Sequence, residues 1–360
     1  MSAQLKKMYD AYRVSPWLDD LSRSALVDGS LSSYVDRGIR GLTSNPTIFA
    51  KAITQGDIYH EAIRKLKAEG MTAEAIYWQL AIEDIKNAAD LLLKTYEESG
   101  KKDGFVSIEV SPKLHCETDE TVKQALWLHQ QIDRPNLMIK VPATTAGLGA
   151  IKQLISQGVN VNVTLIFSLS RYLGVINAYL AGIEDLKSER APASVASFFV
   201  SRVDSAVDNI LDQIGGDARD LKGQAAISQA LAAYGIFLES FHPFSERWQR
   251  LSAKAEPQRL LWASTSTKNP EYDKLKYISG LLTPRSVNTM PGNTIGDLEM
   301  SDMAGWQNAT AKSIESAHSS LGNLQAAGID MPSVADRLEQ EGVEKFNVSF
   351  DEIITAIESV

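Results

Sequence analysis

Residues 137–144 read Leu-Met-Ile-Lys-Val-Pro-Ala-Thr, a stretch that predicts a short buried strand with one charged residue inside it. Four of its first five residues are apolar, and Pro142, which cannot donate a hydrogen bond to a neighbouring strand, ends the run. Lys140 is therefore expected in the interior, where a buried ammonium ion must be paired or lose its proton. A lysine that is partly neutral in an apolar pocket attacks carbonyl groups and forms Schiff bases. The alternative is a strand-end lysine whose ammonium group reaches water.

Seven further stretches have the composition of strands, and helical stretches separate them. They are Ser15–Asp19, Ile39–Thr43, Phe105–Val110, Val159–Phe167, Ser194–Val200, Arg259–Ser264 and Ser286–Met290. Eight strands that alternate with helices predict an α/β fold, a closed (β/α)8 TIM barrel, over about residues 14–327. We expect residues 1–360 to form a single barrel-type domain with additional N- and C-terminal helices, the C-terminal helical extension covering about residues 328–360.

An open, doubly wound sheet is the alternative arrangement of alternating strands and helices. That fold would place a glycine-rich, phosphate-binding turn after its first strand. The first predicted strand instead runs into Trp17-Leu18-Asp19-Asp20, which contains no glycine. The closed barrel is therefore favoured.

Local signals predict several details of the helices. A break is expected at Gly70–Thr72 within the helical region Tyr59–Glu98, with Thr72 as an N-cap. Further helices are predicted over Leu26–Asp36, Tyr272–Leu281, Val334–Gln340 and Phe350–Ser359. We expect the last helices to pack against the barrel and to leave its catalytic mouth open.

Composition and charge limit the class of protein. Hydrophobic content of 44%, charged content of 22% and a net charge of -9 are typical of a soluble globular protein and argue against a nucleic-acid partner. The single cysteine, Cys116, excludes an intramolecular disulfide and indicates a reducing compartment. Met1–Asp10 lacks the apolar run of a signal peptide, and no stretch is apolar over enough residues to span a membrane. We expect a cytoplasmic protein, a monomer or homodimer, without a membrane partner.

The histidines indicate that no metal is bound. All five are scattered, and no pair has the spacing of metal ligands: His60, His115, His129, His242 and His318. We therefore expect neither a metal nor a cofactor.

Polar residues follow or end several predicted strands, at the face where barrel enzymes carry their active sites. They are Asp19, Asn45, Glu109, Lys140, Asn162, Thr164, Ser197, Ser264 and Lys268. Each has a structural alternative: Asp19 could cap a helix, Asn45 could shape a turn, and Asn162 and Thr164 could pair inside the barrel. Together they form a predicted ring of carboxylates, amides and hydroxyls around one lysine. These are the groups that Schiff-base chemistry with proton transfer requires.

Two basic residues lie near the sixth and seventh predicted strands. Arg202 follows Ser197 by five residues, and Lys268 follows Ser264 by four. Barrels often bind phosphate near their last strands, where arginine and lysine donate charge-assisted hydrogen bonds. The alternative is a pair of solvated loop charges.

The chain resembles the transaldolase family of the longer bacterial type, and the resemblance covers nearly all of the barrel. It is carried by ordered motifs that include Trp17-Leu18-Asp19-Asp20-Leu21-Ser22-Arg23, Gly41-Leu42-Thr43-Ser44-Asn45-Pro46-Thr47, Met138-Ile139-Lys140-Val141-Pro142-Ala143-Thr144, Asn160-Val161-Asn162-Val163-Thr164-Leu165-Ile166-Phe167 and Trp262-Ala263-Ser264-Thr265-Ser266-Thr267-Lys268. The resemblance implies a metal-free enzyme of the pentose phosphate pathway. Such an enzyme moves a dihydroxyacetone unit from sedoheptulose 7-phosphate or fructose 6-phosphate to an aldose phosphate, either glyceraldehyde 3-phosphate or erythrose 4-phosphate.

The resemblance also implies a role for each candidate residue. Lys140 would form the Schiff base, Asp19 and Glu109 would transfer protons, and Thr164 would place a water beside Glu109. The substrate would be bound through its hydroxyls by Asn45, Asn162 and Ser197, and through its phosphate by Arg202, Ser264 and Lys268.

Two positions bear on specificity. Where we expect a glycine, between two threonines after the seventh strand, this chain has Ser266, which a positive φ would strain. Phe199 occupies the position at which a fructose 6-phosphate aldolase, the related alternative, is expected to carry a tyrosine that assists proton transfer. Phenylalanine favours transfer over simple cleavage. A sugar-phosphate-binding barrel without catalysis is a further alternative, but it would need no set such as Lys140, Glu109 and Asp19.

Overall fold

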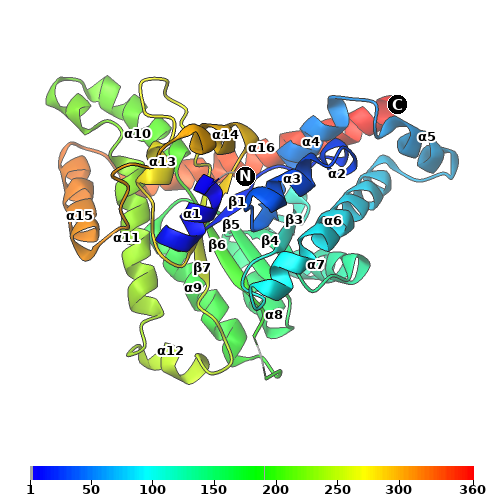
Figure 1. Cartoon of the computed structure of the whole chain (residues 1–360), viewed down its shortest axis with the longest axis horizontal. Helices are drawn as coiled ribbons and strands as arrows, with labels where there is room; N and C mark the ends of the chain where they lie inside the picture. Colours follow the sequence, from blue (N-terminus) through cyan, green and yellow to red (C-terminus); the bar gives the residue numbers. More distant parts are fainter. Residues whose placement is uncertain (1–2, 190) are drawn as a thin grey trace.

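The computed structural model describes residues 3–189 and 191–360, and a closed barrel of eight parallel strands lies at its centre (Figure 1). The strands follow one another around the barrel in chain order: β1 (Val14–Leu18), β2 (Gly41–Thr43), β3 (Phe105–Glu109), β4 (Leu137–Pro142), β5 (Val161–Ile166), β6 (Ser194–Phe199), β7 (Arg259–Ala263) and β8 (Ser286–Met290). β8 pairs with β1 and closes the ring. The predicted barrel is confirmed, and the open sheet is excluded.

The strands are rich in apolar residues because both of their faces are covered. Nearly every strand residue is buried, as expected for a parallel sheet with helices outside and side chains filling its interior. Packing is tight at Gly41 in β2, where a Cβ atom would lie 2.4 Å from Cε2 of Trp17. Only glycine lets β2 pass this buried ring.

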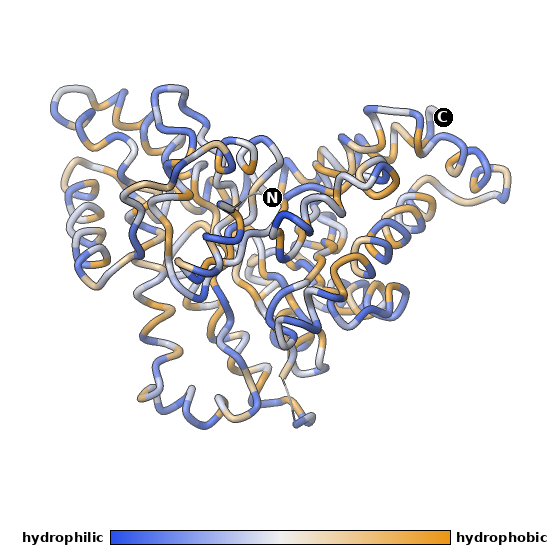
Figure 2. The backbone as a smooth tube through the Cα atoms, in the orientation of Figure 1, coloured by the Kyte–Doolittle hydropathy of each residue, from blue (hydrophilic) through white to orange (hydrophobic). Residues whose placement is uncertain are grey.

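Helices surround the barrel and extend from its two ends. They are α1 (Ala3–Tyr12), α2 (Arg23–Val27), α3 (Ser30–Arg37), α4 (Pro46–Thr54), α5 (His60–Ala68), α6 (Ala73–Glu98), η1 (Pro112–Leu114), α7 (Thr118–Ile132), α8 (Thr145–Ser156), α9 (Leu169–Glu184), α10 (Ser201–Ile214), η2 (Gly216–Leu221), α11 (Ala225–Ser240), α12 (Glu246–Leu251), α13 (Lys276–Ser279), α14 (Gly292–Met300), α15 (Ala311–Ala326) and α16 (Met331–Ser359). Hydrophobic and hydrophilic residues alternate along the outer helices in Figure 2, as expected for helices that bury one face.

The predicted break before α6 is confirmed, whereas two other predicted helices differ. Thr72 caps α6 by accepting a hydrogen bond from the backbone N–H of Ala75 at 3.3 Å. Leu26–Asp36 is not one helix, because Gly29 adopts a φ of +79° between α2 and α3. The helix predicted over Tyr272–Leu281 is reduced to the single turn of α13, because the Thr267 hydroxyl donates to the carbonyl oxygens of Asp273 and Lys274.

The C-terminal segment forms one helix, α16, where two were predicted. Buried residues recur at intervals of four along its middle, from Val334 and Leu338 through Gly342 to Phe346 and Phe350. At Gly342, an added Cβ would lie only 2.9 Å from Cδ2 of Leu165 in β5. The glycine therefore lets α16 lie directly on the end of the barrel.

The prediction of an open mouth is wrong. α16 does pack against the barrel, but it crosses the mouth: the Phe346 ring centroid lies 5.7 Å from Nζ of Lys140. Side-chain contacts hold the helix to both sides of this end. Arg171 Nε lies 3.1 Å from Glu339 Oε2, Thr47 Oγ1 lies 2.9 Å from Ser349 Oγ, and Lys113 pairs with Asp351 at 2.8 Å. Figure 1 shows α16 running beside α4 toward the C-terminus.

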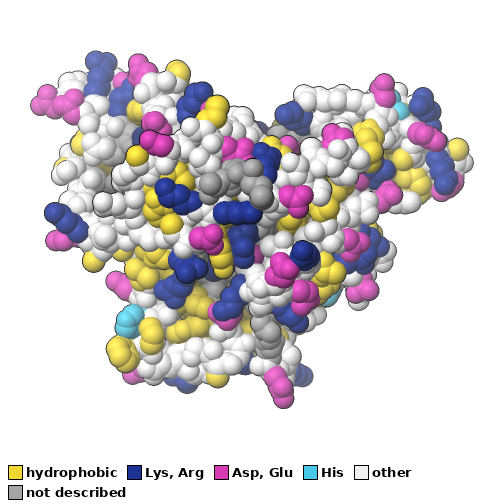
Figure 3. All heavy atoms as spheres, viewed as in Figure 1, with side chains coloured by type: hydrophobic (Ala, Val, Ile, Leu, Met, Phe, Trp, Pro, Cys, Tyr) yellow, Lys and Arg dark blue, Asp and Glu magenta, His cyan; other side chains and the backbone are white. Residues whose placement is uncertain are grey.

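Charged side chains of both signs are interspersed on the face drawn in Figure 3. This face carries no broad area of a single charge. In the described part of the chain, every helix is too short or too polar to cross a membrane.

Candidate active site

Lys140 is buried at the end of β4, beside a buried carboxylate. Strand register places it opposite Glu109 of β3 on one side and opposite Asn162 of β5 on the other. Lys140 Nζ lies 3.1 Å from Glu109 Oε2 and donates a hydrogen bond to the Ser44 carbonyl oxygen at 3.2 Å. Both residues are only 5% exposed. The alternative in which the lysine reaches water is therefore excluded.

Burial raises the pKa of Glu109 above its ordinary value, and the positive charge of Lys140 acts against this shift. The two charged atoms are close, but the contact is not aligned as a hydrogen bond, and Oε2 accepts none from the described residues. A carboxylate with a raised pKa takes a proton more readily from a neighbouring ammonium group. Glu109 is therefore suited to exchanging a proton with groups beside it.

A hydrogen-bonded chain of three side chains lies beside this pair. Ser197 Oγ donates to Asn162 Oδ1 at 2.7 Å, and Asn162 Nδ2 donates to Ser107 Oγ at 3.1 Å. All three residues are at most 1% exposed. This hydrogen-bonded chain fixes the orientation of the Asn162 amide inside the barrel and brings together two of the predicted site residues, Asn162 and Ser197.

Thr164 lies opposite Pro142 in the ladder between β4 and β5. Its hydroxyl is buried and has no hydrogen-bond partner in the part of the chain that the structure describes. The next residue, Leu165, has a φ of +58°, and the register with β6 shifts at this point, which marks a bulge at the barrel rim. An unpartnered buried hydroxyl is uncommon in proteins and indicates a place where water or a ligand binds.

Asp19 and Asn45 lie at the ends of β1 and β2. Asp19 Oδ1 accepts a 2.7 Å hydrogen bond from Thr43 Oγ1, which also lies 2.7 Å from Thr289 Oγ1. Asn45 caps α4, because its Oδ1 accepts from the backbone N–H of Ile48 at 3.0 Å. The side-chain oxygen of Asn45 therefore has the structural role of shaping the turn into α4. Its amide nitrogen donates no hydrogen bond to the described residues.

Phe199 faces the same side of β6 as Ser197. Its ring packs on Phe167 with 5.0 Å between centroids and is 7% exposed. The intervening Phe198 points the other way, toward Tyr172 of α9. Successive side chains of β6 therefore alternate between the two faces of the strand, as in a regular strand.

The candidate phosphate-binding residues come from two neighbouring segments. Arg202 lies in the first turn of α10, with Cζ 5.6 Å from the Phe199 ring centroid. Ser264 follows β7 and contacts Ser201 twice: its carbonyl oxygen accepts from the Ser201 N–H at 3.0 Å, and the two hydroxyl oxygens are 3.0 Å apart. Lys268 lies farther along the same loop and is exposed.

The strain expected at Ser266 is absent. Ser266 is not among the residues with positive φ, and its Oγ lies 2.7 Å from Thr294 Oγ1. The left-handed conformation falls on Ser264 instead, with a φ of +56°. A non-glycine residue in this region is sparsely populated, and such residues cluster at functional sites.

Sequence reasoning missed three contributors to this site: the Ser44 carbonyl, the Ser107 hydroxyl and the Phe346 ring. No sequence pattern indicates that Ser44 would accept from Lys140. Phe346 could have been found from the four-residue spacing of α16, but Gly342 interrupts its apolar residues.

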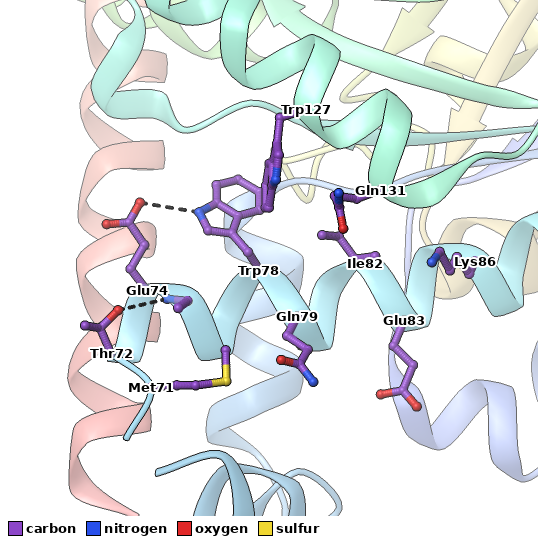
Figure 4. Close-up of a pocket in the computed structure, with 11 residues that line it drawn as sticks. Met71, Thr72, Glu74, Trp78, Gln79, Ile82, Glu83, Lys86, Trp127 and Gln131 are labelled. Carbon is purple, nitrogen blue, oxygen red and sulfur yellow. Dashed lines mark hydrogen bonds between the residues drawn. The ribbon is translucent and has the colours of Figure 1, made fainter. Parts of the chain in front are cut away.

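Two surface pockets flank α16 and its neighbours. One, of about 780 Å³, lies between α6 and α7, where Trp78 and Trp127 are adjacent and Glu74 accepts a hydrogen bond from Trp78 Nε1 (Figure 4). None of the predicted site residues lines it. The other, of about 730 Å³, separates α16 from the segments that follow β3 and β4, and its lining includes Thr144 and Val343. Only this second pocket borders the barrel mouth.

Across residues 3–189 and 191–360, no three histidine, cysteine, aspartate or glutamate side chains gather as a metal site would require. The donors around Lys140 are carboxylates, amides and hydroxyls on separate strands.

Comparisons with known proteins agree with this geometry. The family model described as "Transaldolase/Fructose-6-phosphate aldolase" matches residues 16–357. A curated protein named transaldolase from Mycolicibacterium smegmatis is 45% identical over 351 residues, which cover 95% of this chain and 94% of that protein. Another transaldolase, from Saccharopolyspora erythraea, is 44% identical over 363 residues, with 99% and 97% covered.

Proposed function

The chain belongs to the transaldolase/fructose-6-phosphate aldolase family, and we propose that it acts as a transaldolase through a covalent imine on Lys140. The observation that carries this mechanism is the buried pair of Lys140 and Glu109 at the barrel mouth, 3.1 Å apart. A non-catalytic binding barrel would have no use for a buried amine beside a carboxylate whose pKa is raised.

The reaction begins when Lys140, as a neutral amine, attacks the carbonyl carbon of a ketose phosphate. The carbinolamine that forms loses its hydroxyl as water once a proton is supplied, and an iminium ion results. A base then removes the proton of the C4 hydroxyl, the C3–C4 bond breaks, and its electron pair moves into the iminium group to give an enamine. The aldose phosphate leaves, an acceptor aldehyde adds to the enamine carbon, and the steps run in reverse.

Proton transfer is assigned to Glu109 and Asp19. Glu109 would exchange protons with the carbinolamine through a water bound to Thr164. Two buried atoms without a hydrogen-bond partner among the described residues, Glu109 Oε2 and Thr164 Oγ1, support a water at this place. Asp19 would take the C4 hydroxyl proton, and its hydrogen bond from Thr43 would keep the carboxylate oriented.

Substrate binding is assigned to the remaining candidates. Asn162 and Ser197, held in their hydrogen-bonded chain, and the free amide nitrogen of Asn45 would bind the hydroxyls of the dihydroxyacetone unit. Arg202, Ser264 and Lys268 would bind the phosphate, since guanidinium, hydroxyl and ammonium groups all donate to phosphate oxygens.

Transfer is favoured over simple cleavage by two observations. The Phe199 ring packs on Phe167. Because the Phe199 ring is apolar, it supplies no proton to the enamine. The relatives that match nearly the whole chain carry the name transaldolase. We accordingly propose sedoheptulose 7-phosphate or fructose 6-phosphate as donor and glyceraldehyde 3-phosphate or erythrose 4-phosphate as acceptor. The setting would be the non-oxidative pentose phosphate pathway in the cytoplasm, without a metal, a cofactor or a nucleic-acid partner.

The test is borohydride trapping with fructose 6-phosphate, followed by mass mapping of the modified lysine. Wild-type protein should be labelled at Lys140. Lys140→Arg should fold, as judged by circular dichroism, and should not be labelled, because a guanidinium group is never neutral at working pH. Labelling of another lysine, or of the arginine variant, would refute the assignment. Product analysis with and without erythrose 4-phosphate then separates transfer from cleavage.

A further inference from the structure

We propose that α16 contributes a substrate-binding residue: the ammonium group of Lys345 is a third cation for the phosphate of the substrate, together with Arg202 and Lys268. This inference rests on the proposed function, and it assigns to the C-terminal helix a part in specificity that the barrel strands do not supply.

Lys345 is an exposed residue of α16 that stands three positions after Gly342 and directly before Phe346. Gly342, one turn earlier, packs on Leu165 and Phe167, and the next residue, Phe346, covers Lys140. Phe167 in turn packs on Phe199, whose ring lies beside Arg202. α16 also contacts α10, the helix that carries Arg202. Lys345 therefore lies between the covered lysine and the Arg202 segment.

The causes of two pKa shifts agree with this placement. Partial burial lowers the pKa of Lys345, and the positive charges of Arg202 and Lys268 lower it further. Burial lowers the pKa of Arg202, and the negative charge of Glu341, one turn before Lys345, acts against that shift. Three cations from α10, the loop after β7 and α16 thus share one electrostatic environment.

None of these three cations forms an ion pair within 4.0 Å or a side-chain hydrogen bond among the described residues. Like charges that repel one another without a partner raise the free energy of the folded protein, and a bound phosphate dianion would relieve that repulsion. α16 carries two basic residues, Arg337 and Lys345. Arg337 Nε lies 3.6 Å from Glu341 Oε1, whereas Lys345 has no ion pair among the described residues.

Lys345→Gln tests the proposal, with Lys345→Arg as the charge-keeping variant. The matched control is Lys94→Gln, which removes one positive charge from a side chain that is 84% exposed on α6. Three quantities are compared: KM for fructose 6-phosphate in the transfer reaction, the inhibition constant of inorganic phosphate, and the concentration of unphosphorylated dihydroxyacetone that half-saturates borohydride trapping at Lys140.

For Lys345→Gln we expect both KM for fructose 6-phosphate and the inhibition constant of phosphate to rise about tenfold, the lower end for a charge-assisted contact. Trapping by dihydroxyacetone should change less than about twofold, since that ligand carries no phosphate. Lys345→Arg and Lys94→Gln should stay within about twofold of wild type in all three measurements, because both keep the charge at position 345.

Unchanged KM and phosphate inhibition in Lys345→Gln would overturn the inference, and so would an equal loss for phosphorylated and unphosphorylated ligands, which would mean that Lys345 only supports α16. Neither result affects the proposed function as long as wild-type Lys140 is trapped. Failure of trapping in wild-type protein would overturn both.

Discussion

The two ends of β3 carry buried carboxylates that are held in opposite ways. Asp103 precedes the strand at the base of the barrel and is 1% exposed, and Glu109 ends it at the mouth and is 5% exposed. Asp103 Oδ2 accepts from Ser15 Oγ at 2.9 Å and from Arg40 Nε at 2.8 Å. Its Oδ1 accepts from Arg259 Nη2 at 3.1 Å and from Trp17 Nε1 at 3.3 Å.

Glu109 has far fewer partners. Among the described residues, its only close cation is Lys140, and its Oε2 accepts no hydrogen bond. Burial raises the pKa of Glu109, and few donors stabilise its ionised form. Its carboxyl group is therefore able to take up and release a proton. The contrast separates a buried acid whose hydrogen-bond donors are complete from one whose donors are not, and the proposed reaction assigns proton transfer to the second. In barrels these two conditions fall at the base and the mouth, respectively.

The largest effect is expected from removing the charge at the mouth. Glu109→Gln should lower kcat by about 10²–10⁴-fold, the range for general acid–base catalysis. Because the pKa of Glu109 is raised, the wild-type enzyme should lose the ionised base as the pH falls through that raised value, which lies above the usual value of about 4.3. The pH profile of kcat/KM should show this acidic limb in wild type and not in the variant. An unchanged limb would assign the proton transfer to another group.

The matching change at the base should act on stability alone. Asp103→Asn removes the carboxylate that pairs with Arg40 and Arg259. The side chains of these two arginines are 22% and 19% exposed, respectively. We expect a loss of about 3 kcal/mol in the free energy of unfolding, the lower end for a buried pair that loses one partner. Urea unfolding measures this loss. kcat of the folded fraction should stay within about twofold, and a loss like that of Glu109→Gln would break the comparison.

Phe199→Tyr should change the balance of products at the mouth. A hydroxyl on this ring places a proton donor near the enamine, so release of glyceraldehyde 3-phosphate from fructose 6-phosphate without an acceptor should rise about tenfold, below the full range for a positioned acid. Transfer to erythrose 4-phosphate should fall. Phe198→Tyr, which faces Tyr172 outside the barrel, is the control and should not gain cleavage. An unchanged rate in Phe199→Tyr would make that ring ordinary core.

The smallest effect is expected at Thr164. Its hydroxyl has no hydrogen-bond partner among the described residues, so Thr164→Val should change the free energy of unfolding by less than about 1 kcal/mol. kcat should fall several-fold if the hydroxyl places the water beside Glu109. Thermal unfolding and steady-state kinetics on one preparation measure both. A variant that is less stable and fully active would show that the hydroxyl serves the fold.

Much of the fold could be predicted from local sequence. The eight strands were found because apolar and β-branched runs end at turn residues, and such runs need no knowledge of their partners. The break before α6 was found because Gly70 and Thr72 act within one turn of their own positions. Helices whose boundaries depend on contacts outside the helix were predicted less well. α13 is short because the Thr267 hydroxyl donates to the carbonyl oxygen of Asp273, before the helix begins.

The amino-acid sequence by itself determined that Lys140 would be buried on a strand and that acids, amides and hydroxyls would follow neighbouring strands. Composition and spacing are local properties, so they predicted the barrel and the strand ends from which the proposed site residues come. Only the tertiary structure decided what completes that site: Ser44, 96 positions from Lys140, accepts its hydrogen bond, and α16 brings Phe346 over the same ammonium group. It also decided that Ser264, not Ser266, takes the strained backbone. These outcomes depend on contacts between segments far apart in the chain, whose free energies no local pattern of residues encodes.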